Sequence, residues 1–141
     1  MKLTRASSYA LHAVAFMAAQ KTEKPVASHK IAEDRGIPER FLLKVLKPLV
    51  SARVLRSIKG PNGGYQLARP ASDISMLEIL EAVDGPIRGH APFDAKSNPS
   101  LNNRIEDICN QSAEVVRRAL DKIRISELIA KGDGSSKKKR D

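Results

Sequence analysis

Cysteine and tryptophan are nearly absent from this sequence, whose 141 residues include one cysteine, Cys109, and no tryptophan. A single thiol excludes an intramolecular disulfide, and so sparing a use of cysteine is typical of a reducing cytoplasm. The longest apolar run, residues 9–19, contains His12 and is much shorter than the roughly 20 residues of a membrane span. No small-residue cleavage site follows the first residues, as a signal peptide would require. We therefore expect a cytoplasmic protein.

Patterns that indicate catalysis are also missing from the sequence. The three histidines are scattered, and no nucleophile is paired with a base. The sequence contains neither the spacing of metal ligands nor a phosphate-binding loop motif. We therefore expect a binding protein and not an enzyme.

The positive charge of the chain is concentrated in one half. Residues 1–70 contain 13 Lys and Arg against 4 Asp and Glu, whereas residues 71–130 contain 7 against 10, and the whole chain carries +9. This distribution is expected when one domain binds a polyanion such as nucleic acid. The hydrophobic content of 41% is sufficient for one compact domain with an extension.

The basic half is organised around two predicted helices separated by a tight turn. The first helix covers residues 28–35, with Ser28 as its N-cap and Gly36 as the left-handed residue that ends it. The second helix begins at Pro38, where a missing backbone donor is harmless, and extends to about Ser51.

The second helix separates apolar from cationic side chains. At about 100° per residue, four apolar residues fall on one face, and three cations without a carboxylate fall on the other. A helix-turn-helix uses its second helix in this way, with the cationic face in the major groove, but an ordinary core helix with a solvated face is the alternative. Pro48 lies inside this helix, so we expect either a kink there or an end of the regular helix near Lys47. The apolar face comprises Leu42, Val45, Leu46 and Leu49, and the cationic face comprises Arg40, Lys44 and Lys47.

A hairpin with a glycine-rich tip follows the second helix. Residues 54–59 alternate between apolar and polar side chains, as a half-buried strand does, and residues 65–68 form the return strand. The turn between them is Gly60-Pro61-Asn62-Gly63-Gly64, whose backbone has few Cβ atoms and can approach a phosphate closely. The alternative is a hairpin loop with no binding role. Helix, turn, helix and hairpin in this order predict a winged helix-turn-helix domain.

Three further helices are predicted around this unit. One begins at Ser7 or Ser8, and another covers residues 76–83 after the capping box of Ser75 and Glu78. A long helix over residues 101–123 carries an apolar stripe, which either packs on its own domain or meets a second copy of the chain. The predicted fold class is therefore mainly α with a small β-hairpin wing and a long C-terminal dimerisation helix.

Several segments of the chain resemble one known family. These are residues 1–11, residues 31–33, residues 36–37 and, above all, Lys59-Gly60-Pro61-Asn62-Gly63-Gly64-Tyr65-Gln66-Leu67-Ala68-Arg69-Pro70. They resemble the Rrf-two (Rrf2) family of bacterial winged-helix transcriptional regulators, and the resemblance runs from residue 1 to about residue 129. It implies a sequence-specific DNA-binding regulator, expected to be a repressor, that acts as a homodimer on a pseudo-palindromic operator.

The resemblance also raises the question of an iron–sulfur cluster. Cluster-binding relatives carry three closely spaced cysteines in the region that corresponds to residues 85–100, and this sequence has none there. Because a cluster needs thiolate ligands, we expect neither a cofactor nor a bound metal. An unusual ligand set would use His12, His90 and Cys109. We interpret His12 as a packed helix residue and Cys109 as a small buried hydrophobe.

The predicted organisation has four parts, and two of them carry candidate sites. The parts are the winged helix-turn-helix domain (1–84), a loop (85–100), the dimerisation helix with a closing turn (101–130) and a disordered basic tail (131–141). The predicted DNA-binding residues are Ser28, Lys30, Pro38, Glu39, Arg40, Leu43, Lys44, Lys47, Arg56, Lys59, Gly60, Asn62, Gly63 and Gly64. The predicted dimerisation residues are Leu101, Ile105, Ile108, Val115, Val116, Ala119 and Ile123.

Within the DNA-binding set, we expect Arg40 and Lys44 to contact the major groove, and Arg56 and Lys59 to contact DNA from the wing. The resemblance places Arg40, Leu43 and Lys59 at positions where relatives read bases. Leu43 cannot donate a hydrogen bond, so we expect it to contact a thymine methyl group. The alternative function is a winged-helix module that binds a partner protein, and weak affinity for random DNA at low salt would favour it. The sequence identifies neither an effector nor a target gene.

Overall fold

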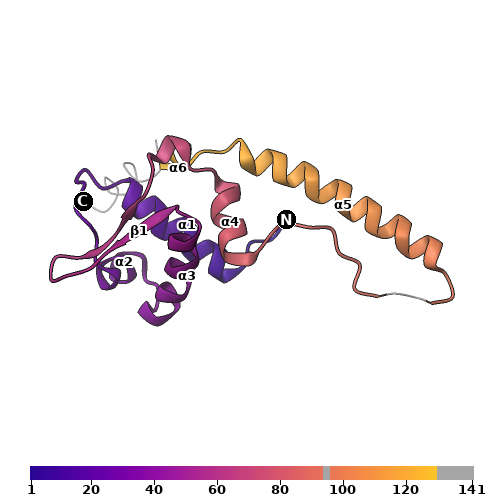
Figure 1. Ribbon diagram of the computed structural model, residues 1–141, viewed down its shortest axis with the longest axis horizontal. Helices are drawn as coiled ribbons and strands as arrows, with labels where there is room; N and C mark the ends of the chain where they lie inside the picture. The colour runs from indigo at the N-terminus through magenta and orange to yellow at the C-terminus, as the bar shows by residue number, and fades with distance from the viewer. Residues whose placement is uncertain (94–95, 130–141) are drawn as a thin grey trace.

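The computed structural model of this protein describes residues 1–93 and 96–129, and the predicted basic tail lies outside these residues. Figure 1 shows a packed group of helices and a hairpin, from which α5 extends as an arm. The predicted fold class, mainly α with a two-stranded wing, is confirmed. Within the described part of the chain, no helix is both long and apolar enough to cross a membrane. The elements are α1 (Arg5–Ala18), α2 (Ser28–Arg35), α3 (Glu39–Ser51), β1 (Leu55–Ile58), β2 (Gly64–Leu67), the 3-10 turn η1 (Ala71–Asp73), α4 (Met76–Asp84), α5 (Pro99–Asp121) and α6 (Ile125–Ile129).

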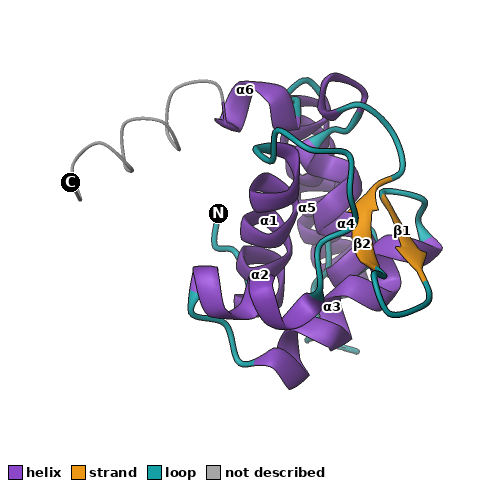
Figure 2. Cartoon of the chain, turned by 90° about the vertical axis from the view of Figure 1, so that its left-hand side faces the viewer, coloured by secondary structure: helices purple, strands orange, loops and turns teal. Residues whose placement is uncertain are grey.

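The core of the domain is built around α1, which packs against α2, α3, α4 and α6. Its buried face includes Ala10, Ala13 and Val14, all with no exposed surface. The predicted apolar face of α3 is confirmed, because its four residues are between 0 and 4% exposed. Figure 2 shows the hairpin beside α3, so the burial of this face against α1 turns the opposite face of α3 outwards, next to the wing.

The start of α1 differs from the prediction, because the helix begins at Arg5 and not at Ser7 or Ser8. Thr4 is its N-cap, and the Thr4 side chain accepts a hydrogen bond of 3.0 Å from the Ser7 backbone N–H. The Thr4 hydroxyl also donates to the Asp84 carboxylate at the end of α4, at 2.8 Å, and the buried Ser7 hydroxyl donates to the same carboxylate. This contact places a negative charge at the positive end of the α1 dipole and joins two helices that are distant in sequence.

The α2–α3 turn confirms one predicted boundary and corrects two others. Gly36 adopts the left-handed conformation, with φ of 67°, and ends α2 as predicted. The prediction that Ser28 caps α2 is wrong, because Ala27 occupies that position and the Ser28 hydroxyl instead donates to Glu39 of α3 at 2.9 Å. An end of regular helix near Lys47 is also wrong. α3 continues through Pro48 to Ser51, with Leu46 and Leu49 buried on either side of the proline.

The wing is an antiparallel pair in which Leu55 lies opposite Leu67 and Ser57 opposite Tyr65. The segment before α2 adds a one-residue bridge, since Val26 and Tyr65 exchange two backbone hydrogen bonds of 2.8 Å. Gly64 lies beside this bridge with φ of 152°, and a Cβ built on it would be 2.3 Å from the Val26 carbonyl oxygen. The wing is therefore tied to the body of the domain, and a side chain at position 64 would separate them.

The C-terminal elements return to the domain through α4. The predicted capping box of Ser75 and Glu78 is confirmed. Helical spacing predicts that Met76, Ile79, Leu80 and Val83 face inwards. Of these, Ile79 and Leu80 are buried, Met76 and Val83 are half-buried, and Leu77 is buried as well. The buried face is wider than predicted because α4 contacts α1 and α3 as well as α5.

The arm, α5, begins two residues earlier than predicted and is about 35 Å long at 1.5 Å per residue. Asn98 caps it by accepting a hydrogen bond of 3.1 Å from the Leu101 backbone N–H. After α5 the chain turns back, and the backbone N–H of Ile125 donates to the carbonyl of Ile74 at 2.9 Å. The chain that follows α5 thus holds the C-terminal end of this helix against the domain.

Candidate nucleic-acid interface

The exposed face of α3 carries the predicted cations. Arg40, Lys44 and Lys47 are all exposed, and none of them pairs with a carboxylate among the residues that the structure describes. Glu39 is the one acidic residue in this helix, and it accepts the hydrogen bond from Ser28. The face therefore presents unneutralised positive charge, as contact with phosphates or with guanine requires.

The ends of α2 and α3 place further predicted residues around this face. The helix begins at Glu39 and not at Pro38 as predicted, because Pro38 is its exposed N-cap. Lys30 is exposed on α2, and Ser28 is half-buried and bonded to Glu39. The hydrogen bond between Ser28 and Glu39 holds the two helices together at the point where they are joined. Because its hydroxyl is used in this way, Ser28 contributes to the geometry of the turn.

Sequence reasoning missed one residue of this face, Phe41. Its side chain is 38% exposed although it is large and apolar, and Leu43 is 42% exposed nearby. The centroid of the Phe41 ring lies 4.8 Å from the Arg40 guanidinium carbon and 5.7 Å from the Lys44 ammonium nitrogen. The spacing i, i+1, i+4 of cation, aromatic and cation is present in the sequence and is the signal that could have indicated this arrangement.

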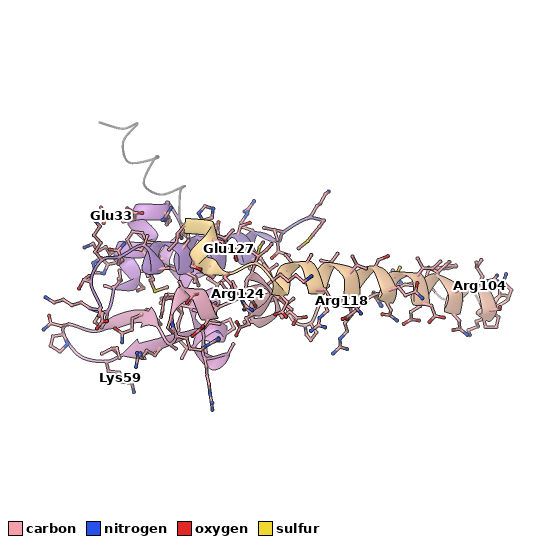
Figure 3. The ribbon with its side chains drawn as sticks, turned by 90° about the horizontal axis from the view of Figure 1, so that it is seen from above. Glu33, Lys59, Arg104, Arg118, Arg124 and Glu127 are labelled. Carbon is pink, nitrogen blue, oxygen red and sulfur yellow. The ribbon has the colours of Figure 1, made fainter. Side chains whose placement is uncertain are left out.

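The wing presents its predicted residues in two different ways. Arg56, Lys59, Gly60 and Asn62 are exposed, and Figure 3 shows Lys59 at the hairpin end of the molecule, opposite the end where Arg104 lies on α5. Gly63 and Gly64, by contrast, are half-buried. Their lack of a side chain leaves room for the close packing of the wing. A Cβ on Gly63 would lie 2.1 Å from the Ile58 carbonyl oxygen. The packing of the hairpin is thus a sufficient reason for both glycines.

One basic residue beside the wing is occupied by the fold. Arg69 donates to the Glu78 carboxylate at 2.5 Å and to the Asp73 backbone carbonyl at 2.9 Å. Burial raises the pKa of the Glu78 carboxyl, but the hydrogen bonds from Arg69 and Ser75 outweigh this effect, so its pKa lies below the ordinary 4.5. Arg69 therefore joins the end of the hairpin to α4 and is not part of the cationic face.

The predicted dimerisation residues divide into two groups, and all lie on α5 except Ile123, because the helix ends at Asp121 and not at residue 123 as predicted. Ile108 and Val115 are 62% and 65% exposed, and Leu101, Ile105 and Ala119 are also exposed. Val116 and Ile123 are half-buried, because they pack against Leu77, Leu80 and Leu120 of the same chain. The helix thus uses one side to bind its own domain and leaves a neighbouring apolar stripe uncovered.

The segment after α4 is held against α5 by specific contacts. Glu81 accepts from the Ile87 backbone N–H at 2.8 Å and from Arg117 of α5 at 3.0 Å. The hydrogen bond from Arg117 lowers the pKa of Glu81 below 4.5, although partial burial opposes it. Gly89 packs directly on the helix backbone, since a Cβ there would lie 2.2 Å from the Asn110 nitrogen. A cavity of about 490 Å³ lies under this segment, between α4, α5 and residues 1–3.

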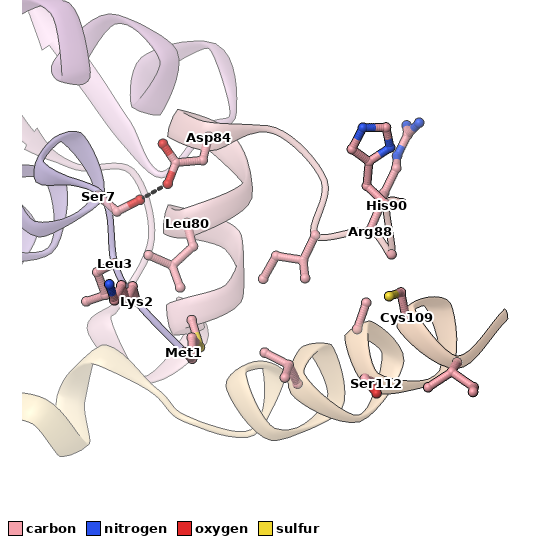
Figure 4. Close-up of a pocket in the computed structure, with 15 residues that line it drawn as sticks. Met1, Lys2, Leu3, Ser7, Leu80, Asp84, Arg88, His90, Cys109 and Ser112 are labelled. Carbon is pink, nitrogen blue, oxygen red and sulfur yellow. Dashed lines mark hydrogen bonds between the residues drawn. The ribbon is translucent and has the colours of Figure 1, made fainter. Parts of the chain in front are cut away.

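The residues around this cavity do not fit an iron–sulfur cluster. The cysteine-free segment contributes His90, and α5 contributes Cys109, the single thiol of the chain. In Figure 4 the His90 ring points away from α5 and the Cys109 sulfur. The described residues contain no group of three His, Cys, Asp or Glu placed to hold a metal.

Two of the burial predictions for these candidate ligands are wrong. His12 is exposed and not packed, because it lies on the side of α1 opposite Ala10 and Val14. Cys109 is half-buried and not fully buried, because it lines the open cavity instead of the core.

Comparison with known proteins identifies the family of this chain. The profile of the Rrf2 family, described as iron-dependent transcriptional regulators, matches residues 3–131. Protein rrf2 of Nitratidesulfovibrio vulgaris is 36% identical over 92% of this chain and 87% of that protein. An HTH-type transcriptional regulator of Mycobacterium tuberculosis is also 36% identical, over 62% of this chain, and the match spans 54%, about half, of that relative's length.

The fold is shared with solved structures as well. CymR, described as the global cysteine regulator of Bacillus subtilis, superimposes with a TM-score of 0.75 at 23% identity, covering 94% of this chain and 99% of that one. Three observations agree with membership in this family. They are the order of helices, turn and wing, the exposed cations of α3, and the match of the family profile over residues 3–131. This protein belongs to the Rrf2 family of helix-turn-helix transcriptional regulators.

Proposed function

We propose that this protein is a cytoplasmic regulator, not an enzyme, which binds double-stranded DNA as a homodimer and represses transcription from a pseudo-palindromic operator. The observation that carries the proposal is the geometry of α3. Its apolar face is buried against the domain, and its opposite face exposes Arg40, Lys44 and Lys47 without a described carboxylate partner. Membership in a family of transcriptional regulators supports the same conclusion.

In the proposed complex, α3 enters the major groove with its N-terminal half. Arg40 and Lys44 contact base edges, and Leu43, 42% exposed, contacts a thymine methyl group. Lys30, Lys47, Arg56 and the exposed part of the wing around Lys59 lie along the phosphates. These contacts supply nonspecific affinity and hold the helix in register.

The proposed dimer is formed by α5. Five of the predicted residues form an apolar stripe that the chain itself leaves exposed: Leu101, Ile105, Ile108, Val115 and Ala119. A second copy that covers this stripe on a two-fold axis would place two copies of α3 on one side of a duplex. The half-sites would then lie about 34–36 Å apart, or a multiple of that distance.

We propose further that the regulator works without an iron–sulfur cluster. One cysteine per chain is too few thiolates for the usual ligand set, and the His90 ring points away from that cysteine. Protein purified without oxygen should therefore be colourless and free of iron, and it should still bind DNA. Visible absorption together with elemental analysis tests this.

The experiment that tests DNA binding begins with selection of an operator from a random duplex library by the wild-type protein. Arg40→Ala should then weaken operator binding by about 1–3 kcal/mol, because a bidentate base contact is lost. Lys59→Ala should weaken binding to all sequences and reduce the slope of log affinity against log salt by about 1. Lys122→Ala removes an equal charge from an exposed side chain at the C-cap of α5, outside the proposed interface residues, and is the matched control.

Gel-shift titrations at two salt concentrations measure all three variants. An Arg40→Ala protein with unchanged operator affinity would contradict the proposed placement of α3. Failure of the wild type to select any duplex would contradict DNA binding itself.

A further inference from the structure

Phe41 is one of the large apolar residues that the described chain leaves partly exposed. It lies near the start of α3, and 38% of its surface is exposed. At about 100° per residue it lies at one edge of the cationic face, about a quarter of a turn from the face's centre. It is not among the residues that form either apolar core of the described chain. The packing of the two apolar cores therefore does not account for a phenyl ring at this position.

The ring has two close neighbours, and both are cations of the proposed recognition face. Arg40 and Lys44 lie 4.8 Å and 5.7 Å from the ring centroid, within the distance at which a cation is attracted to an aromatic face. The described carboxylates form no ion pair with either cation, so the ring is the partner that the structure shows for them.

We propose that Phe41 is a positioning residue of the recognition helix, which holds the Arg40 guanidinium, and more weakly the Lys44 ammonium, ready for base contact. This inference rests on the proposed DNA binding and adds a residue to it. A free arginine side chain loses much rotamer freedom when it makes a bidentate contact. An arginine already held against a ring loses less, so the complex is tighter for the same contact.

Burial in the groove strengthens the effect. Attraction between a cation and a ring is modest at an exposed site and larger once water is removed. Because the ring is at the edge of the cationic face, it can remain against one face of the Arg40 guanidinium while the N–H groups at the edge of the guanidinium point to a base. The ring thus affects specificity through Arg40, whereas a ring that simply packed on α3 would affect stability alone.

The test is a double-mutant cycle on the operator selected by the wild type. Phe41→Leu removes the aromatic face and keeps apolar bulk, Phe41→Tyr keeps the aromatic face, and each is combined with Arg40→Ala. Phe93→Leu makes the same chemical change at a phenyl group that is 77% exposed in the segment before α5, and is the matched control. Thermal unfolding is measured for every variant, and Phe41→Met replaces Phe41→Leu if the latter does not fold.

We expect Phe41→Leu to weaken operator binding by about 2- to 30-fold, which corresponds to the usual range for a cation held by a ring. The same substitution should lose most of its effect in the Arg40→Ala background, and Phe41→Tyr and Phe93→Leu should bind within about twofold of the wild type. Affinity for random duplex should change less than affinity for the operator.

Three results would overturn the inference. Equal losses from Phe41→Leu with and without Arg40 would mean that the ring acts independently of the guanidinium. Equal weakening of operator and random DNA, or a Phe41→Tyr variant as weak as Phe41→Leu, would also exclude positioning by the ring. In each case the wild type would still bind its operator, so the proposed function would stand.

Discussion

Replacement of Ile108 by aspartate should dissociate the proposed dimer without unfolding the chain. Ile108 is 62% exposed in the single chain and belongs to neither apolar core of the described residues. Full burial of an isoleucine side chain is worth about 1.5–3 kcal/mol, so covering this exposed part contributes about 1–2 kcal/mol. Because a two-fold dimer covers Ile108 in both subunits, this residue contributes about 2–4 kcal/mol to the stability of the dimer. Ile108→Asp should therefore raise the dimer dissociation constant by roughly 30- to 1,000-fold, and the buried charge adds to this.

Sedimentation velocity over a range of protein concentrations measures the effect. Asn103→Asp adds the same negative charge to the same helix, but on the face opposite the stripe, and should leave the dimer intact. Circular dichroism should show both variants folded. On DNA, Ile108→Asp should lose tight binding to the full operator while it retains weak binding to a half-site.

A different result would refute the assignment of the stripe. If Ile108→Asp and Asn103→Asp dimerise equally well, the subunits meet elsewhere on the chain. If the wild type is a monomer at all concentrations and on its operator, the exposed stripe has another role.

Two further predictions concern the stability of the fold. Gly64→Ala should destabilise the protein by more than the roughly 1–3 kcal/mol of backbone strain, because the new Cβ also meets the Val26 carbonyl. At Gly60, φ is 109° and a Cβ would have nothing within 4 Å, so Gly60→Ala should lower the free energy of unfolding by the backbone strain alone. Urea unfolding measures both variants, and an equal loss of stability in the two would contradict the clash with Val26. Glu81→Gln should lower the free energy of unfolding at pH 7 by about 0.5–1 kcal/mol, because Arg117 lowers the pKa of Glu81 in the folded state. A carboxyl whose pKa is lower in the folded state stabilises the fold at pH values above its unfolded pKa, and this contribution is lost as the pH falls through the folded pKa. The free energies of unfolding of the wild type and Glu81→Gln should therefore converge below pH 4.5. A difference that stays constant with pH would exclude this ion pair.

Local patterns in the sequence were sufficient to predict most of the elements. The apolar face of α3, the left-handed Gly36 and the capping box at Ser75 each depend on residues within a few positions of one another. Such signals carry their own geometry, because helix periodicity and capping are properties of a short segment. The charge difference between the two halves is equally visible in the sequence and indicates a nucleic-acid partner.

One of the incorrect predictions, the cap of α2, involves a partner distant in sequence. Ser28 was expected to cap α2, but its hydroxyl donates to Glu39, 11 residues away. The start of α1, by contrast, has a local cap, because Thr4 accepts from the Ser7 backbone N–H three residues away, and the distant Asp84 adds further hydrogen bonds. A side-chain hydroxyl takes the best available acceptor, and a sequence window does not contain these acceptors.

The sequence by itself therefore determined the fold class, the cationic face of α3 and the absence of enough thiols for a cluster, because each follows from residue type and short spacing. Tertiary structure alone decided which side of α5 packs on its own domain, that Gly64 and Gly89 touch backbone from other segments, and that Phe41 lies against Arg40. These features depend on where segments meet in space and on which rotamer a side chain adopts there. Hydrophobic burial favours any compact arrangement, and only the packing of specific side chains selects one.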